Sequence, residues 1–345
     1  MNYTIYMSVE SIVKSIYDAD KESLEFSKPL YYKLLCQWLK KGVNSFDKMT
    51  DLPKTVIENL KAKYTSPILS EVIDVKKDIS STKLLLKLYD GLLVECVLLK
   101  REDGLYTACV SSEVGCTMKC EFCATGSVGF KRALNWWEII EQFFHLKALN
   151  NELDRIVFMG MGEPLCNFEN VKRAIEYIKG EIGMSPRRIT VSTSGIAPGI
   201  KALADSKLGV KLALSLVTAN DRVRNTLMSA SRLYSLTELK KALLYYSEKE
   251  NRRIALEYCM LKGVNTDRKS ADELKNFTKG LIYSVNLIPW NKLDFLPFDT
   301  PSAKEIKEFE GYLNALNVKY TIRVSRGRDT SAACGMLVAK NKGGV

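Results

Sequence analysis

The stretch "GCTMKCEFCATGSVGF", residues 115–130, indicates the fold class of this chain. Within it, Cys116, Cys120 and Cys123 follow the spacing C-x3-C-x2-C. Structural zinc normally takes four ligands in two separated pairs, and no fourth ligand stands nearby, since the only histidine, His145, falls in a helical pattern further on. An iron–sulfur cube also binds cysteine thiolates. The spacing therefore favours a cluster with one iron left open for a substrate or cofactor, and zinc is the alternative.

From about residue 105 onward, strand-like and helix-like segments alternate. Six runs have strand character: 106–112, 155–160, 187–193, 210–216, 252–260 and 285–290. Helical periodicity appears between them, at 135–149, 168–180, 235–250 and 270–281. Six βα units predict a parallel sheet, open or closed as a barrel, and a full eight-unit barrel needs two more. The cysteine loop follows the first strand, at the sheet edge where ligand sites form.

The first hundred residues have a different pattern. Residues 1 to about 65 read as helices, with Gly42 expected to follow the end of one helix and Asp51 expected as the N-cap of the next, ahead of Pro53. Further on, the turns at 90–91 and 103–104 are both Asp-Gly and stand between strand-like runs. These turns predict β-hairpins.

Composition limits the classes of function. The longest apolar runs are strand-length, and the N-terminus has no basic region followed by an apolar core, so we expect a cytoplasmic location. Nine cysteines in such a chain favour metal binding or catalysis over disulfides. The net charge of +11 favours a polyanionic partner, nucleic acid first, and the alternative is a merely solvated basic surface.

Several motifs together resemble those of a known family. With Phe122 before its last cysteine, the C-x3-C-x2-C loop is similar to the signature of the radical S-adenosylmethionine (SAM) superfamily. More closely, the chain resembles the RlmN/Cfr family in five segments: "CVSSEVGCTMKCEFCATGSVGFKR", "FMGMGEPLCN", "RRITVSTSGIAPGI", "VNLIPWN" and "RDTSAACGML". The likeness runs from about residue 30 to 340. It implies a radical-SAM partial (βα)6 barrel at 105–345, after an N-terminal helical accessory domain at 1–68 and a small β-hairpin linker region at 69–104.

The resemblance also implies a reaction. Enzymes of this family methylate an adenosine ring carbon, C2 or C8, of ribosomal RNA, and RlmN also acts on some transfer RNAs. One [4Fe–4S] cluster, bound by Cys116, Cys120 and Cys123, would bind SAM at its open iron. An electron donor such as flavodoxin or ferredoxin is implied, and nothing in the sequence demands more than a monomer. The positions that match the family's SAM contacts are Gly162, Glu163, Ser192, Ser215 and Asn291.

Three further residues match the family's catalytic groups. Cys334 matches the cysteine that carries the methyl group as S-methylcysteine, and Cys109 matches the resolving cysteine that forms a transient disulfide with it. Glu95 matches the proposed proton acceptor, a role that fits the proton loss needed to restore the aromatic base. Without the resemblance, both cysteines would read as buried structural thiols. We interpret the other cysteines, Cys36, Cys96, Cys166 and Cys259, as structural.

The chain also departs from the family pattern. Val217 stands where the family usually has histidine, and Met336 stands where it often has glutamine. The target carbon therefore stays open between C2 and C8. Candidate phosphate contacts follow the cluster loop, begin a strand or precede Cys334: Lys131, Arg132, Arg187, Arg188, Arg323, Arg326 and Arg328. The alternatives are a radical SAM enzyme with a non-RNA substrate and a non-enzymatic cluster-binding module.

Overall fold

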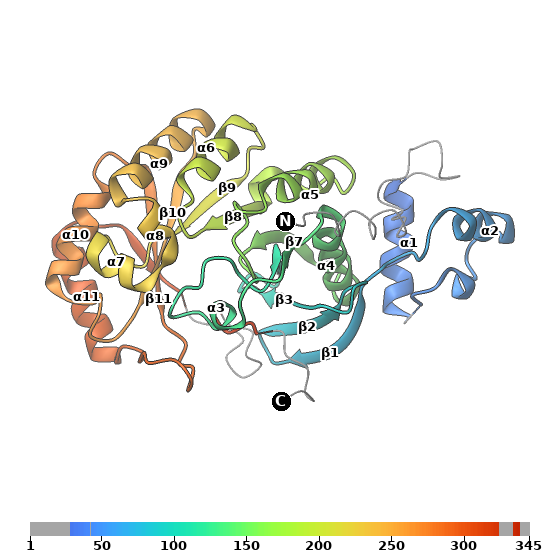
Figure 1. The fold of residues 1–345 in the computed structure, drawn as a ribbon, viewed down its shortest axis with the longest axis horizontal. Coiled ribbons are helices and arrows are strands. Elements are labelled where there is room, and N and C mark those ends of the chain that lie inside the picture. The colour runs from blue at the N-terminus through green and yellow to red at the C-terminus, as the bar shows by residue number, and fades with distance from the viewer. Residues whose placement is uncertain (1–27, 42, 324–333, 339–345) are drawn as a thin grey trace, which may run out of the picture.

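The computed structural model describes residues 28–41, 43–323 and 334–338, and its centre is one sheet. Ten strands form this sheet in the order β1-β2-β3-β4-β7-β8-β9-β10-β11-β12. The strands curve around an interior, and most of the helices lie along the outer side of the sheet (Figure 1). Because β1 and β12 are edges that do not pair with each other, the barrel is open.

The six predicted βα strands form the parallel part of the sheet. They pair side by side, and the short β12 (Tyr320–Ile322), which we did not predict, extends them in parallel at one edge. The six strands are β4 (Tyr106–Val110), β7 (Leu153–Phe158), β8 (Ile189–Thr193), β9 (Lys211–Ser215), β10 (Ile254–Met260) and β11 (Tyr283–Pro289). The prediction of a parallel α/β sheet with six such strands is confirmed.

Helices connect these strands and cover their outer side. The four predicted helices are α4 (Trp136–Leu149), α5 (Phe168–Gly180), α9 (Leu236–Glu250) and α10 (Arg268–Thr278). Capping boxes begin α4, α9 and α11. In each box the first residue's side chain and a glutamate three positions later bond to each other's backbone N–H. Five further helices among the described residues were not predicted from the sequence: α3 (Ala124–Val128), α6 (Ala197–Asp205), α7 (Asp221–Leu227), α8 (Ser229–Leu233) and α11 (Ala303–Ala315).

The β-rich segment before the barrel joins the same sheet. Strands β1 (Glu71–Lys77), β2 (Ser81–Lys87) and β3 (Leu93–Lys100) pair antiparallel in sequence, and β3 pairs antiparallel with β4. Both Asp-Gly turns are present, with Gly91 and Gly104 at φ +83° and +82°, values that favour glycine. The division of the chain at residues 68 and 104 stays a prediction, but these strands are hydrogen-bonded to the barrel.

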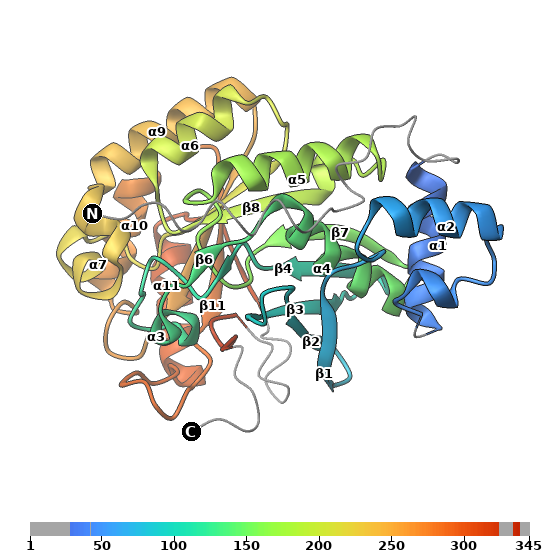
Figure 2. The ribbon, with the colours of Figure 1, turned by 45° about the vertical axis from the view of Figure 1, so that its right-hand side comes forward.

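Two helices at one end of the molecule belong to the N-terminal region (Figure 2). Helix α1 (Lys28–Lys40) packs beside α4 and buries Tyr31, Leu35 and Trp38. After a 3-10 turn (Phe46–Lys48), α2 (Lys54–Lys63) begins with Pro53 at its N-cap position. The prediction that Asp51 caps α2 is wrong, because helical geometry begins only after Pro53. Gly42 lies outside the described residues. No described helix is long and apolar enough to span a bilayer.

Candidate active site

The cysteine loop is closed at its base by a short ladder. Strands β5 (Glu113–Val114) and β6 (Arg132–Ala133) pair antiparallel on the two sides of the loop. Gly115 has φ +79°, and a Cβ there would lie 1.7 Å from the carbonyl oxygen of Gly129. The chain can therefore turn into the loop only with glycine at this position.

Later parts of the barrel hold the loop in place. The Trp290 indole N–H donates a 2.8 Å hydrogen bond to the carbonyl oxygen of Phe122, and the Ser229 hydroxyl donates to that of Met118. The backbone N–H of Glu121 donates to the carbonyl oxygen of Leu227, 3.0 Å away. These bonds fix the loop over the carboxyl ends of the strands before any cofactor binds.

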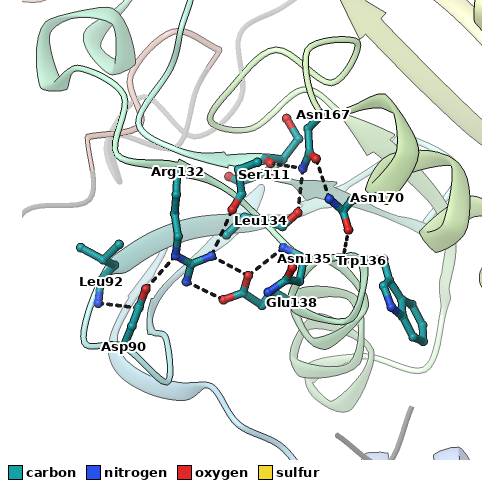
Figure 3. Close-up of polar contacts among 12 residues, drawn as sticks. Asp90, Leu92, Ser111, Arg132, Leu134, Asn135, Trp136, Glu138, Asn167 and Asn170 are labelled. Carbon is teal, nitrogen blue, oxygen red and sulfur yellow. Dashed lines mark hydrogen bonds and ion pairs between the residues drawn. The ribbon is translucent and has the colours of Figure 1, made fainter. Parts of the chain in front are cut away.

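An ion-pair network ties the return of the loop to α4 (Figure 3). The Arg132 guanidinium donates two hydrogen bonds to Glu138, of 2.7 and 2.8 Å, and a third of 2.7 Å to Asp90. Glu138 also accepts from the backbone N–H of Asn135. Arg132 is thus fully engaged by two carboxylates, which argues against the phosphate contact that we predicted for it. Arg326 and Arg328 lie outside the described residues.

A cavity of about 200 Å³ brings the predicted cluster and SAM residues together. They come from the loop and from the ends of separate strands, positions up to 175 residues apart in the chain (116 to 291), yet all face one space. The predicted residues in its wall are Cys116, Cys120, Cys123, Gly162, Glu163, Ser192, Ser215, Asn291 and Cys334.

The three cysteines fit an iron–sulfur cluster. All nine cysteines lie in the described residues, and all are free thiols. Burial raises the pKa of Cys116 to about 12 and also raises that of Cys120 well above its usual value, and the charges of neighbouring cysteines add to both shifts. Bound iron supplies the positive charge that reverses these shifts and keeps coordinating thiols ionised. Among the described side chains no three converge on a single metal ion, but a cube does not need this, because each thiolate binds a different iron.

Glu163 shapes the wall of this cavity through its backbone contacts. Its buried carboxylate accepts hydrogen bonds from the backbone N–H groups of Ser194, at 2.6 Å, and Leu165, at 3.1 Å. Burial raises the pKa of Glu163 despite these bonds. Beside it, Gly162 has φ +97°, and a Cβ there would lie 2.6 Å from the Cβ of Glu113. The segment after β7 is therefore tightly held where SAM is expected.

A larger cavity of about 810 Å³ meets the first at its wall. Cys123 and Cys334 line both cavities, and Cys109 lines the larger one. Cys334 retains exposed surface, whereas Cys109 is buried. Burial, followed by the charge of Cys334, raises the pKa of Cys109 well above its usual range. The two predicted catalytic cysteines thus face a common space.

The short segment 334–338 is fastened at several points. The carbonyl oxygen of Cys334 accepts a 3.2 Å hydrogen bond from the Asn291 side chain. The carbonyl oxygen of Gly335 accepts one of 2.8 Å from the Ala124 N–H, and that of Leu337 accepts one of 2.8 Å from the Thr125 hydroxyl. The N–H of Val338 donates to the carboxylate of Glu95 over 2.8 Å. The cluster loop and β3 therefore hold Cys334 near Cys123.

Glu95 is part of this fastening. It is buried on β3 and forms an ion pair with Lys83, with nitrogen and oxygen 2.8 Å apart. Val97 lies opposite Cys109 across the strands, so Glu95, two residues away, points to the same face as Cys109. Among the described residues, those lining the two cavities do not include Glu95. Its role as a proton acceptor stays a prediction.

Sequence reasoning missed several residues of the site. Cys259, which we interpreted as structural, lines the smaller cavity with Glu257 and Trp290. The signal was the two-residue period of β10, which places Ala255, Glu257 and Cys259 on one face. Val217, in the position where the family usually has histidine, also lines this cavity, with φ +62°. By contrast, His145 is buried in α4, with a ring nitrogen 3.1 Å from the hydroxyl of Ser70.

The barrel, the three-cysteine loop and the facing SAM candidates define a radical SAM enzyme. Residues 110–274 match the family model for the radical SAM superfamily. Over 89% of this chain and 92% of the other, the structure superposes on a radical SAM methyltransferase from Sphaerobacter thermophilus, with a TM-score of 0.83 and 37% identity.

Curated relatives narrow this class to a family. A probable dual-specificity RNA methyltransferase RlmN from Treponema denticola is 45% identical over 87% of both chains. The dual-specificity RNA methyltransferase RlmN of Nitratiruptor sp. is 41% identical over 96% of this chain and 99% of its own. The chain belongs to the RlmN/Cfr family of radical SAM methyltransferases.

Proposed function

We propose that this protein methylates an adenosine ring carbon, C2 or C8, in ribosomal RNA and in some transfer RNA. The methyl group travels through S-methylcysteine at Cys334, and each turnover uses two SAM molecules. The observation that carries the proposal is the position of Cys334 in the wall between two cavities. One cavity contains the cluster cysteines and the SAM candidates, and the other contains Cys109.

The smaller cavity is our candidate for the binding site of the cofactors. A cluster held there by Cys116, Cys120 and Cys123 supplies, when bound, the electron that cleaves SAM. The SAM candidates at the strand ends would orient the methionine part and the nucleoside of SAM between the loop and the barrel: Gly162, Glu163, Ser192, Ser215 and Asn291. Trp290 and Phe122 keep the loop in position for this contact.

The two catalytic cysteines would divide the work of transfer and release. Cys334, with exposed surface, accepts and carries the methyl group. Cys109 releases the product: its sulfur bonds to the sulfur of Cys334 while the bond between that sulfur and the transferred carbon breaks, and the carbon, now on the base, takes up a proton to become the methyl group. Because burial raises its pKa, Cys109 is a protonated, weakly reactive thiol, and it must lose its proton to attack the sulfur of Cys334. Glu95 faces the same side of the sheet and is our candidate for taking the proton from the modified base.

Mass spectrometry of the Cys334 peptide tests this function. The protein is reconstituted with iron and sulfide without oxygen and supplied with methyl-labelled SAM. We expect a labelled methyl on Cys334, no label in Cys334→Ala, and a trapped RNA–protein adduct in Cys109→Ala when RNA is present. Cys166→Ala is the control, since Cys166 lies outside the walls of both cavities and should load normally. An unlabelled Cys334 in protein that still cleaves SAM would favour a radical SAM enzyme with a non-RNA substrate.

A further inference from the structure

The larger cavity has an unusual concentration of positive charge. Seven basic side chains line it, against two carboxylates, Glu102 and Glu257. The basic residues are Arg101, Arg155, Arg188, Lys211, Arg252, Arg253 and Arg323. They come from widely separated parts of the chain, so the charge is concentrated by the fold and not by a basic run in the sequence.

Most of this charge lies at the amino ends of the parallel strands. Arg155 stands near the start of β7, Lys211 begins β9, and Arg252 and Arg253 directly precede β10. This is the end of the barrel opposite the cluster loop, because parallel strands all run in one direction. We call the group Arg155, Lys211, Arg252 and Arg253 the cationic mouth.

The residues of the cationic mouth are not neutralised by acidic neighbours. No ion pair within the described residues involves any of the four, whereas the nearby Arg101 pairs with Asp154. Burial lowers the pKa of Lys211, and the charges of Arg155, Arg252 and Arg101 lower it further. Positive groups that repel one another oppose folding, so this arrangement does not serve stability.

The interior of the barrel connects the mouth with the catalytic cysteines. Because side chains alternate along a strand, Lys211 shares its face with Ser215, which lines the cluster cavity. Along β9 these two residues stand about 13 Å apart at a rise of about 3.3 Å per residue. The same cavity that contains the cationic mouth also contains Cys109 and Cys334. An anionic group at the mouth would therefore lie one short strand away from the site of methyl transfer.

We propose that the cationic mouth binds backbone phosphates of the substrate RNA, so that the target nucleotide enters the barrel from the amino ends of the strands. The inference rests on the proposed function for its substrate and adds the direction from which that substrate arrives. SAM carries a net positive charge and is expected at the other end, so the mouth is unsuited to it. An adenosine that leaves its stack can extend into the barrel while its flanking phosphates stay among the cations.

RNA binding measured at several salt concentrations tests the proposal. The probe is a fluorescent single-stranded RNA oligonucleotide containing adenosine, and the proteins are reconstituted Arg155→Gln, Lys211→Gln and the double variant. Each lost phosphate contact should weaken binding and reduce the slope of log affinity against log salt by about 1. The control is Arg222→Gln, an exposed arginine on α7 at the cluster end, which should bind like the wild type.

Two results of the binding assay would overturn the proposal. The first is an unchanged salt slope in the double variant when the wild type binds the RNA. The second is that free AMP displaces the RNA and binds as tightly, per phosphate, as the RNA does. The cationic mouth would then be a site for small anions. Failure of the proposed function shows itself separately, as an unlabelled Cys334, because the binding assay needs neither SAM cleavage nor methyl transfer.

Thermal stability without RNA gives a second readout. Removing one of several repelling charges should leave the melting temperature of Lys211→Gln unchanged or raise it at low salt, and the gain should vanish at high salt. A melting temperature that falls in both Lys211→Gln and Arg155→Gln would mean that these cations stabilise the fold, and the proposal would lose its basis.

Discussion

Lys83 and Glu95 form an ion pair inside the protein, where a single change has a large effect. Their side chains are only 6% and 8% exposed. Lys83→Met would leave the carboxylate of Glu95 buried without its cation, so we expect the free energy of unfolding to fall by about 3–5 kcal/mol. Urea denaturation of the cluster-free protein measures this loss.

The matched variant is the double change Lys83→Met with Glu95→Gln. It removes both charges and should recover part of the loss, because a neutral pair no longer leaves an unpaired charge inside. If Lys83→Met is as stable as the wild type, the carboxylate of Glu95 has another partner in the variant, and the ion pair does not stabilise the fold.

Arg224 is a buried guanidinium that forms no ion pair with a carboxylate among the described residues. It is fully buried, donates to the carbonyl oxygens of Leu216 at 3.1 Å and Ser194 at 2.5 Å, and its Nη1 finds no hydrogen-bond partner within the described structure. Burial lowers its pKa to about 10, so it stays charged at neutral pH. Burial raises the pKa of Cys120, and the charge of Arg224 partly opposes that rise.

Loss of this charge should alter the electronics of the bound cluster. In Arg224→Met we expect a lower midpoint potential of the cluster, because the variant lacks the buried positive charge near Cys120 that favours the added electron. A tenfold change in the redox equilibrium corresponds to about 59 mV. Arg224→Lys should retain most of the wild-type potential. Exposed Arg232→Met is the control, and potentials are read by redox titration with electron paramagnetic resonance. Equal potentials in Arg224→Met and the wild type would rule the effect out.

At the scale of elements, a polar cluster joins α4 to the segment directly before β1. Glu141 accepts hydrogen bonds from the N–H groups of Leu69 and Ser70, at 2.9 and 2.8 Å, and from the Ser70 hydroxyl. Burial raises the pKa of Glu141 to about 7 and lowers that of His145, one helical turn later, to about 4. Burial in the folded protein therefore favours the neutral form of each side chain over the charged form.

The two shifts give opposite slopes of stability against pH. Glu141 stabilises the fold at pH values below its ordinary pKa of 4.5, and this contribution is lost as the pH rises through about 7. His145 stabilises the fold at pH values above its ordinary pKa of 6.5, and this contribution is lost as the pH falls through about 4. In wild type they oppose each other between pH 4.5 and 6.5. In His145→Gln only the Glu141 slope remains. Its free energy of unfolding should therefore fall by about 3 kcal/mol between pH 4.5 and 7, which is seen as a falling melting temperature.

The complementary variant is Glu141→Gln, in which only the His145 slope remains. Its stability should rise from pH 4 to 6.5. Identical pH profiles for both variants would contradict the opposed shifts and mean that other groups dominate this range.

The secondary structure shows which elements local sequence could predict. The six parallel strands, the two Asp-Gly hairpins and the capped helices α4 and α9 follow from periodicity and turn chemistry. The start of α2 was misplaced because Pro53 and its preceding residue favour extended backbone, which overrode the capping signal at Asp51.

For the whole molecule, the cluster is expected to tie distant segments together. The loop at 115–130 contacts the ends of several strands and the segment 334–338. Reconstitution should therefore raise the melting temperature and slow amide hydrogen exchange at 116–124 and 334–338, because binding favours the folded state. Helices α1 and α2, at one end of the molecule (Figure 2), should exchange at the same rate with and without cluster. Uniform slowing across the chain would point to a general effect of iron and not to a local tie.

The sequence by itself determined the parallel α/β class, the three-cysteine loop, the family and the residues expected to bind SAM, because these depend on local periodicity, spacing and motif. It could not place Cys259 in the site or bring Arg155, Lys211 and Arg252 together, since long-range pairing of strands decides those contacts. The tertiary structure also changed the meaning of single residues. Arg132, basic and next to the loop, is paired with two carboxylates. The cations at the strand starts have no acidic partner within the described part of the chain and so can bind an anion from outside.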